Sequence, residues 1–111
     1  MINNPSNPCG SCFTKKHQLE IIAVADECKI PIIADEVYYG LSYEDGVEFT
    51  SFGNLTKEVP VICTGAVSKI FVLPGWRLGW TITYNNNGYF DDVIDRLHRH
   101  AQIQLHPNSL A

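Results

Sequence analysis

The stretch KIPIIADEVYYG, residues 29–40, is a short apolar run that ends abruptly in two acidic residues, Asp35 and Glu36. A run of this kind predicts a strand buried in a parallel sheet, with its polar side chains at the carboxyl end. The stretch VPVICTG, residues 59–65, has the same character and predicts a second buried strand. Residues 41–58 between them are mixed and contain glycine and asparagine, so we expect a loop there with one irregular helical turn.

One helix is predicted before these strands in the sequence and another after them. Thr14 is a suitable N-cap for a helix that runs to about Cys28. The apolar side chains that recur at helical spacing in it are Leu19, Ile22 and Ala23, with Ile21, Ala25 and Cys28 on an adjacent strip. A second helix is predicted from about Tyr89 to Leu105. Its apolar side is formed by Phe90, Val93, Ile94, Leu97, Ala101 and Leu105.

A third strand is predicted in WRLGWTITY, residues 76–84, which alternates and is rich in aromatic and β-branched residues. The turn NNNG, residues 85–88, closes it. The connection from the second strand to the third is too short for a helical crossover, so we expect these two strands to be antiparallel. Arg77, at the start of the third strand, then returns to the end of the sheet that carries Asp35.

Strands that alternate with helices indicate an α/β domain with a mostly parallel sheet, one antiparallel strand and flanking helices. The length of 111 residues allows one domain or part of one. In sheets of this type, ligands bind beyond the carboxyl ends of the strands. Here those ends carry Asp35 and the loop with Ser68 and Lys69, so we expect a binding site there.

The composition is that of a soluble globular protein, with 45% hydrophobic residues, 18% charged residues and a formal net charge of -4. No cluster of lysine and arginine is present, so a nucleic-acid partner is not indicated. The apolar runs fall far short of the roughly 20 residues that a membrane helix needs, and the start MINNPSNPCG lacks a signal-peptide pattern. We therefore expect no membrane partner and a cytoplasmic location, with a mitochondrial one left open.

The four cysteines include one C-x-x-C pair, Cys9 and Cys12, a motif that occurs in redox pairs and in zinc sites. Cys28 and Cys63 are isolated inside apolar segments, so we expect two core cysteines and no metal site. A thiol redox module remains an alternative, although Cys9 follows a proline-rich turn and not a strand. The histidines lack partners at ligand spacing, and we expect a solvated surface position for each: His17, His98, His100 and His106.

Three charged residues from different strand ends are expected to converge: Asp35, Lys69 and Arg77. A lysine can lose its proton in a desolvated site and form a Schiff base, whereas an arginine stays charged and binds phosphate or carboxylate through two hydrogen bonds. A ligand that carries an aldehyde and a phosphate would use both side chains. Pyridoxal phosphate has these groups, and its ring nitrogen needs a carboxylate partner to stay protonated.

Three motifs occur in register along the chain: NPSNPCG at residues 4–10, ADEVY at residues 34–38, and SK followed by PGWRLGW within residues 68–80. With these motifs the chain resembles the class I and II aminotransferases of fold type I, and within them the tyrosine aminotransferase branch. The resemblance covers essentially all 111 residues. It implies that residues 1–111 are part of the pyridoxal-phosphate-binding large domain of such an enzyme, with its N-terminal and C-terminal parts missing.

The resemblance implies a chemical role for two residues. Lys69 would form the Schiff base with pyridoxal phosphate and, once released by substrate, would move a proton between the substrate α-carbon and the cofactor. Asp35 would pair with the protonated ring nitrogen and so stabilise the negative charge that develops at the α-carbon. Taken alone, Asp35 at a strand end is equally consistent with a helix cap or a turn cap.

Four further residues would hold the cofactor in place. Asn7 and Tyr38 would donate hydrogen bonds to the phenolic oxygen of the ring, and Arg77 would bind the phosphate, with Ser68 as a weaker ligand of the same group. Each of the first three has a structural alternative when taken alone: a turn residue for Asn7, a packing aromatic for Tyr38 and an ion-paired cation for Arg77. Only the joint pattern favours the cofactor.

The chain departs from the family near the expected phosphate site. Many relatives carry a serine at the position of Ala66, and the tyrosine aminotransferase branch often has Arg-Trp where this chain has Ile70 and Phe71. An additional tyrosine, Tyr39, precedes Gly40. The loss of one charge-assisted hydrogen bond to phosphate would cost about 1.5–3 kcal/mol of binding free energy.

The expected function is the transamination of an aromatic amino acid with a 2-oxo acid by the full-length enzyme, which the resemblance implies to be a homodimer. A β-lyase or synthase on the same fold is the nearest alternative, because a carbanion beside the same lysine can react in several ways. A non-catalytic interaction fragment is an alternative of another class. We expect the isolated chain to be marginally stable and inactive, because a sheet without its neighbours leaves unpaired edges and uncovered apolar faces.

Overall fold

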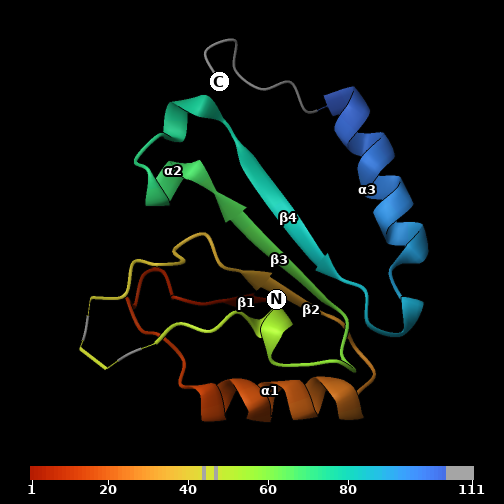
Figure 1. The fold of residues 1–111 in the computed structure, drawn as a ribbon, viewed down its shortest axis with the longest axis horizontal. Helices are drawn as coiled ribbons and strands as arrows, with labels where there is room; N and C mark the ends of the chain where they lie inside the picture. Colours follow the sequence, from red (N-terminus) through yellow and green to blue (C-terminus); the bar gives the residue numbers. More distant parts are fainter. Residues whose placement is uncertain (44, 47, 105–111) are drawn as a thin grey trace.

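The computed structural model describes residues 1–43, 45–46 and 48–104. Leu105 and His106, which the sequence predicts as a helix end and a solvated histidine, lie outside the described residues. In the described part, four strands form one sheet in the order β1-β2-β3-β4 (Figure 1). Their bounds are Ile2–Asn3 for β1, Ile32–Asp35 for β2, Val61–Ala66 for β3 and Gly79–Tyr84 for β4.

The sheet is mostly parallel, as predicted. Strand β1 pairs with β2 and β2 with β3 in parallel, whereas β3 and β4 are antiparallel. Ala66 lies opposite Gly79 in the last pair, so the chain reverses its direction at the carboxyl end of β3, as the short connection requires. The sequence pattern does not predict β1, because a strand of two residues followed by a proline-rich turn has no periodicity to detect.

Helix α1, Lys15–Glu27, lies along one side of the sheet (Figure 1). It begins at Thr14, whose Oγ1 accepts a hydrogen bond from the His17 backbone N–H at 3.3 Å, so the predicted N-cap is confirmed. Ile22 and Ala25 are buried, as their helical spacing predicts. These two side chains attach the helix to the core.

The buried side of α1 is rotated relative to the predicted apolar side. Leu19 and Ala23 are exposed. Cys28, just after the helix, is also exposed, so its prediction as a core cysteine is wrong. Gln18 is buried instead, and its Nε2 donates to the backbone oxygen of Thr50 at 2.8 Å. The helix can bury this amide because the carbonyl takes its hydrogen bond.

The hydrophobic core lies between α1 and one face of the sheet. Alternate residues of β2 and β3 point into it, because Ile32, Ala34, Val61 and Cys63 are all buried. The other buried members of the core are Ile22, Ala25, Phe52 and Val59. The intervening residue Ile33 is 43% exposed, so the strand is buried on one face and the other is an uncovered apolar face of the kind that the sequence predicts for this chain. In the described part of the chain, β2 is covered on one face.

Between β2 and β3 the chain forms the 3-10 helix η1, Phe52–Asn54, which is the irregular helical turn that the sequence predicts. Phe52 is fully buried in the core. Gly53 lies against the ring of Tyr84 in β4, and the Tyr84 hydroxyl donates to Asn54 Oδ1 at 3.1 Å. These contacts join η1 to the last strand of the sheet.

Replacement of Gly53 by alanine is expected to destabilise the protein by about 1–3 kcal/mol, because the new Cβ would overlap the ring of Tyr84. Urea unfolding measures the change in the free energy of unfolding. Gly75→Ala is the matched control, since a Cβ there meets no atom within 4 Å. Equal stability of the two variants would contradict the close contact between η1 and Tyr84.

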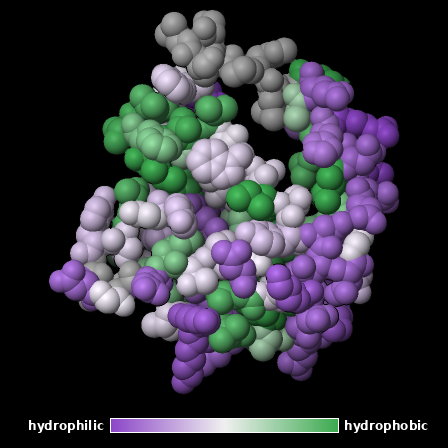
Figure 2. All heavy atoms as spheres, viewed as in Figure 1, coloured by the Kyte–Doolittle hydropathy of each residue, from purple (hydrophilic) through white to green (hydrophobic). Residues whose placement is uncertain are grey.

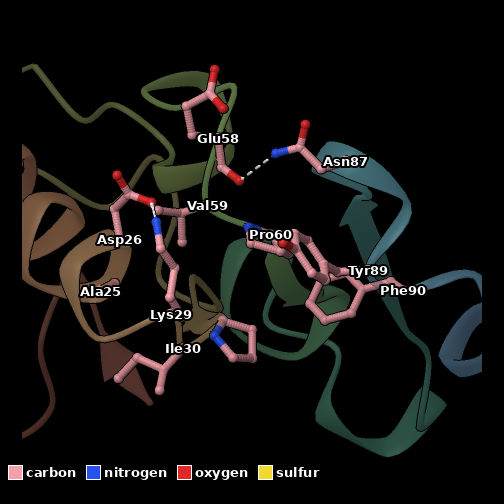
Figure 3. Close-up of a pocket in the computed structure, with 11 residues that line it drawn as sticks. Ala25, Asp26, Lys29, Ile30, Glu58, Val59, Pro60, Asn87, Tyr89 and Phe90 are labelled. Carbon is pink, nitrogen blue, oxygen red and sulfur yellow. Dashed lines mark hydrogen bonds and ion pairs between the residues drawn. The ribbon is translucent and has the colours of Figure 1, made fainter.

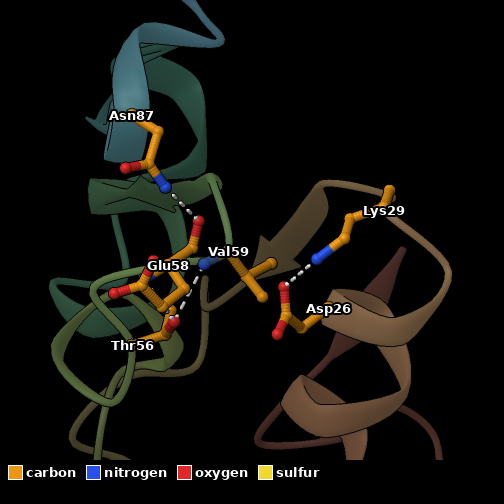
Figure 4. Close-up of polar contacts among 6 residues, drawn as sticks. All are labelled: Asp26, Lys29, Thr56, Glu58, Val59 and Asn87. Carbon is orange, nitrogen blue, oxygen red and sulfur yellow. Dashed lines mark hydrogen bonds and ion pairs between the residues drawn. The ribbon is translucent and has the colours of Figure 1, made fainter.

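The turn after β4 is the 3-10 helix η3, Asn86–Gly88, at the position of the predicted NNNG turn. Asn87 Nδ2 donates to the backbone oxygen of Glu58 at 3.2 Å, as the close-up in Figure 4 shows. Asn86 Nδ2 donates to the backbone oxygen of Val59 at 2.7 Å. The two asparagines thus tie the end of β4 to the segment that leads into β3.

Helix α3, Asp91–Gln104, follows this turn, so the second predicted helix is confirmed over the described residues. From the end of β4 the chain turns back, and α3 runs on the β4 side of the sheet (Figure 1). Val93 and Leu97, on its predicted apolar side, remain more than a third exposed. None of the described helices combines the length and the apolar character that a membrane-spanning helix requires.

Candidate active site

Three segments that carry predicted site residues lie at the carboxyl end of the parallel strands (Figure 1). Asp35 is the last residue of β2. The short helix α2, Val67–Ile70, follows β3 directly and carries Lys69. The chain then passes through the 3-10 helix η2, Pro74–Trp76, and reaches Arg77 two residues before β4. The topology therefore brings these three residues to one end of the sheet.

The half-buried carboxylate of Asp35 is held through one of its two oxygens. Its Oδ1 accepts hydrogen bonds from the Val37 backbone N–H at 3.3 Å and from Thr64 Oγ1 at 3.2 Å. Thr64 is the residue paired with Asp35 between β2 and β3. Within the described residues, Oδ2 takes part in no hydrogen bond. Asp35 is therefore a turn cap through Oδ1 and keeps Oδ2 available for a ligand.

The ammonium group of Lys69 lies over an aromatic ring. Its Nζ is 5.7 Å from the centroid of the Tyr38 ring, which is within the range of cation–π attraction. Lys69 is exposed and forms no ion pair with a described residue. The sequence predicts a loop here, and it misses α2 because a single turn capped by Ala66, without a side-chain hydrogen bond, has no helix signature.

Arg77 occupies the left-handed backbone region, with φ of 51°. Its Nη1 donates to the backbone oxygen of Pro74 at 3.1 Å, and no described carboxylate pairs with its guanidinium. Val72, on the same connection, also has a positive φ, of 56°. Such backbone conformations cost about 1–3 kcal/mol each and are concentrated at functional sites. The exposed guanidinium is thus available to an anion, and the structural ion-pair alternative has no partner in the described residues.

Asn7 lies in an exposed loop between β1 and α1. Ser6 N–H donates to Ser11 O at 2.9 Å, which closes the loop on itself. At its base, Asn4 Oδ1 accepts a hydrogen bond from the Phe13 backbone N–H at 2.8 Å. The Asn4 Nδ2 is buried and has no partner in the described part of the chain. This loop is a fixed turn, as its prolines and asparagines predict.

The polar groups of the predicted ligand residues are not used by contacts within the described residues. No hydrogen bond is formed there by the carboxamide of Asn7, the hydroxyl groups of Tyr38 and Ser68, or the ammonium group of Lys69. Together with the guanidinium of Arg77 and the free oxygen of Asp35, they offer several donors and one carboxylate. This set fits pyridoxal phosphate, which has a phosphate, a phenolic oxygen and an aldehyde to meet the donors and a ring N–H to meet the carboxylate.

Glu36 is the charged residue whose role the sequence analysis missed. It is only 7% exposed and faces the core side of the sheet. Its Oε1 accepts hydrogen bonds from Ser51 Oγ at 3.1 Å and from the Phe52 backbone N–H at 2.9 Å. Burial raises the pKa of this carboxyl group above its ordinary value, although the hydrogen bonds partly oppose the shift. Glu36, which directly follows Asp35, therefore holds η1 to the end of β2.

The variant Glu36→Gln is expected to change the pH dependence of stability. Because the folded state raises the pKa of Glu36 above 4.5, it binds this proton more tightly than the unfolded chain does. The resulting stabilisation is complete below pH 4.5 and is lost as the pH rises through the raised pKa. Urea unfolding from about pH 4 to pH 8 should show the variant gaining stability relative to the wild type as the pH rises. A pH-independent difference would contradict this.

The cysteines give no support to a redox module. Cys9 and Cys12 are free thiols, and burial raises the pKa of Cys12, which disfavours the reactive thiolate. Cys63 is buried in the core, as predicted. Among the described residues, no three side chains of the metal-binding types are grouped as a metal site would require.

A cavity of about 450 Å³ (Figure 3) is lined by residues that precede β2 and β3 and follow β4, so it lies at the end of the sheet opposite to Asp35 and Lys69. Its lining includes Lys29 after α1, Pro60 before β3 and Phe90 before α3. Lys29 Nζ pairs with Asp26 at 2.9 Å (Figure 4). The cavity therefore holds none of the predicted site residues.

Apolar side chains gather on the surface over α2 and η2 (Figure 2). The exposed large apolar side chains of this connection before Arg77 are Phe71, Val72 and Trp76. The patch follows Lys69 directly in sequence and precedes Arg77. Exposed apolar surface beside a site often marks a contact with another chain or a ligand.

Comparison with known proteins gives consistent matches. The family model "Aminotransferase class I and II" matches residues 1–111. The chain is 43% identical over 112 residues to tyrosine aminotransferase of Dictyostelium discoideum. The alignment covers 99% of this chain and 27% of that protein. Alanine aminotransferase from Pyrococcus furiosus superposes with a TM-score of 0.88 at 40% identity, over 97% of this chain and 27% of that one.

A second solved structure, tyrosine aminotransferase from Leishmania infantum, superposes with a TM-score of 0.83 at 35% identity. The match covers 92% of this chain and 28% of that one. These structures confirm the predicted α/β arrangement. The chain spans about a quarter of the length of the relatives that it matches.

Proposed function

Because the chain belongs to the class I and II aminotransferases, as its three motifs predict, we propose that it is the cofactor-binding part of a pyridoxal-phosphate-dependent aminotransferase. In the proposal, residues 1–111 belong to the large domain of that enzyme. The observation that carries the proposal is the position of Asp35, Lys69 and Arg77 at one end of the sheet, with Lys69 free of any ion pair to a described residue.

When bound, pyridoxal phosphate would supply a conjugated ring that withdraws electrons from the substrate α-carbon. Lys69 would hold its aldehyde covalently and then, as a free amine, move the proton at the substrate α-carbon. Asp35 would accept a hydrogen bond from the ring N–H through the Oδ2 that its protein contacts leave free. The negative charge of this carboxylate would keep the ring nitrogen protonated.

The remaining residues would bind and orient. Asn7 and Tyr38 would donate hydrogen bonds to the phenolic oxygen, and Arg77 and Ser68 would hold the phosphate. The ring of Tyr38 also attracts the Lys69 ammonium group, whose Nζ lies 5.7 Å from the ring centroid. Ala66, which caps α2 without a side-chain hydrogen bond, offers the phosphate no hydroxyl group.

The proposed substrates are an aromatic L-amino acid, tyrosine above all, and a 2-oxo acid as amino acceptor. The tyrosine aminotransferase relatives support this choice. We further propose that the complete enzyme is a homodimer whose second subunit covers the exposed apolar patch of Phe71, Val72 and Trp76. A β-lyase or synthase is the competing function, because the bound cofactor would also allow the substrate to lose a β-substituent once Lys69 has taken its α-proton.

The test uses the complete protein that carries this chain, loaded with pyridoxal phosphate. Tyrosine and a 2-oxo acid are supplied, and the 2-oxo acid derived from tyrosine is quantified. Alanine serves as the comparison substrate. Amino transfer with a higher kcat/KM for tyrosine supports the proposal, and transfer from alanine alone would contradict the aromatic preference. Release of free ammonia without formation of a new amino acid would support a lyase instead.

A further inference from the structure

We propose that Asn3 is a positioning residue that fixes the distance between Asn7 and Asp35. The inference rests on the proposed function, in which these two residues contact the cofactor ring from different segments. No motif of the sequence points to Asn3, and its role comes from its contacts alone. It would act through Asn7 and would not itself touch the cofactor.

The side chain of Asn3 bridges the two segments. Its Oδ1 accepts a hydrogen bond from the Asn7 backbone N–H at 2.6 Å, and its Nδ2 donates to the Asp35 backbone oxygen at 3.2 Å. Asn3 stands in β1 directly opposite Asp35 in β2. The Asp35 oxygen also accepts a hydrogen bond from the Asn4 backbone N–H at 3.1 Å, so the β2 end of the bridge is firmly held.

The bridge is the contact that locates Asn7 in the described structure. The other hydrogen bonds of its loop join Ser6 to Ser11, Gly10 to Ser6 and Phe13 to Asn4, and all of them lie within residues 4–13. They set the shape of the loop, and the bond from the Asn4 backbone N–H to the Asp35 oxygen holds the start of the loop to β2. Asn7 is exposed, and within the described residues its own hydrogen bond goes to Asn3, which ties its backbone directly to the strand beside Asp35.

An asparagine suits this position for a chemical reason. The bridge needs an acceptor for the Asn7 N–H and a donor for the Asp35 carbonyl, separated by the width of one carboxamide. An aspartate provides only acceptors, and an alanine provides neither group. Because small errors of position at a reacting centre reduce binding and rate strongly, a loose Asn7 should be measurable at the cofactor.

The readout is the pH titration of the absorbance of lysine-bound pyridoxal phosphate. A donor to the phenolic oxygen favours its ionised form, so a displaced Asn7 changes the pKa of the chromophore. We expect Asn3→Ala to raise this pKa by about half a unit or more and to weaken cofactor binding about tenfold. Asn3→Ser, which keeps a polar side chain too short for the bridge, should shift the pKa in the same direction.

Asn85→Ala is the matched control. Asn85 also makes two hydrogen bonds through its carboxamide, from Nδ2 to Asp91 Oδ1 at 2.6 Å and to Oδ1 from the Phe90 backbone N–H at 2.7 Å. It lies after β4, at the end of the sheet away from the site. This variant should lose stability in urea but leave the titration of the bound cofactor unchanged.

The decisive comparison repeats Asn3→Ala in an Asn7→Ala background, because residues that act through one another give non-additive effects. A shift of the chromophore pKa that appears with Asn7 present and disappears without it supports the inference. A shift of equal size in both backgrounds, or none in either while Asn7→Ala itself shifts the pKa, overturns it. If Asn7→Ala leaves the titration unchanged, the proposed role of Asn7 fails, and the inference fails with it.

Discussion

The variant Lys69→Arg is expected to lower kcat/KM for transamination by about 10²- to 10⁴-fold, because arginine keeps the positive charge but cannot act as a base or form the covalent bond. The charge on α2 and the contact with the Tyr38 ring can persist in the variant. The decrease in kcat/KM therefore measures the loss of the amine as a base and as the group that forms the covalent bond. Steady-state kinetics on the complete, cofactor-loaded protein measure the effect.

Lys29→Arg is the control for this variant. Lys29 forms an exposed ion pair with Asp26 at 2.9 Å, at the other end of the sheet, and arginine can keep that pair. Its kcat/KM should stay within about twofold of the wild type, since exposed ion pairs contribute little. Comparable activity of Lys69→Arg and the control would remove Lys69 from the mechanism.

The variant Asp35→Asn should show the second large effect, a decrease in kcat of about 10²- to 10³-fold. The Oδ1 of asparagine can still accept the hydrogen bonds from Val37 and Thr64, so the free energy of unfolding should change little. The negative charge that would keep the cofactor ring nitrogen protonated is lost. Kinetics and urea unfolding of the same preparation separate the two consequences.

Asp26→Asn provides the comparison for a carboxylate outside the site. Asp26 lies on α1 and pairs with Lys29, so its neutralisation should leave kcat within about twofold of the wild type. A large loss of stability in Asp35→Asn would indicate that the carboxylate acts in the structure. An unchanged kcat would contradict its role at the ring nitrogen.

The strands that the sequence predicts are those with a strong local signal. The apolar runs that become β2 and β3 and the alternating run that becomes β4 have hydrophobic patterns of several residues. Strand β1 has none, because its two residues are held by pairing with β2. The same holds for α2, a single turn between β3 and η2.

Helix α1 shows why the spacing of apolar residues predicts the presence of a helix more reliably than it predicts which side of the helix is buried. Its limits follow from Thr14 and the apolar spacing, but Gln18 replaces Leu19 in the core because a distant carbonyl, that of Thr50, satisfies the amide. Spacing along one helix contains no information on such a partner. Cys28 is exposed for a related reason, since it lies at the C-cap, beyond the part of the helix that packs.

In the candidate site, too, some residues have a local sequence signal and others do not. Asp35, Lys69 and Arg77 could be predicted because each lies in a motif at a strand end. Asn3 and Glu36 could not, because their partners are distant in sequence: Asp35 is 32 residues from Asn3, and Phe52 is 16 residues from Glu36. Both support the strand end that carries Asp35. Contacts of this kind become visible only once the strands are paired.

The most direct test of the account is to trap the bound cofactor. The complete protein is incubated with pyridoxal phosphate and reduced with borohydride, and the labelled peptides are mapped by mass spectrometry. We expect a saturable label confined to Lys69. The other lysines of the chain serve as internal controls: Lys15, Lys16, Lys29 and Lys57. Labelling spread evenly over these lysines, or no label on Lys69, would contradict the assignment of the cofactor to this site.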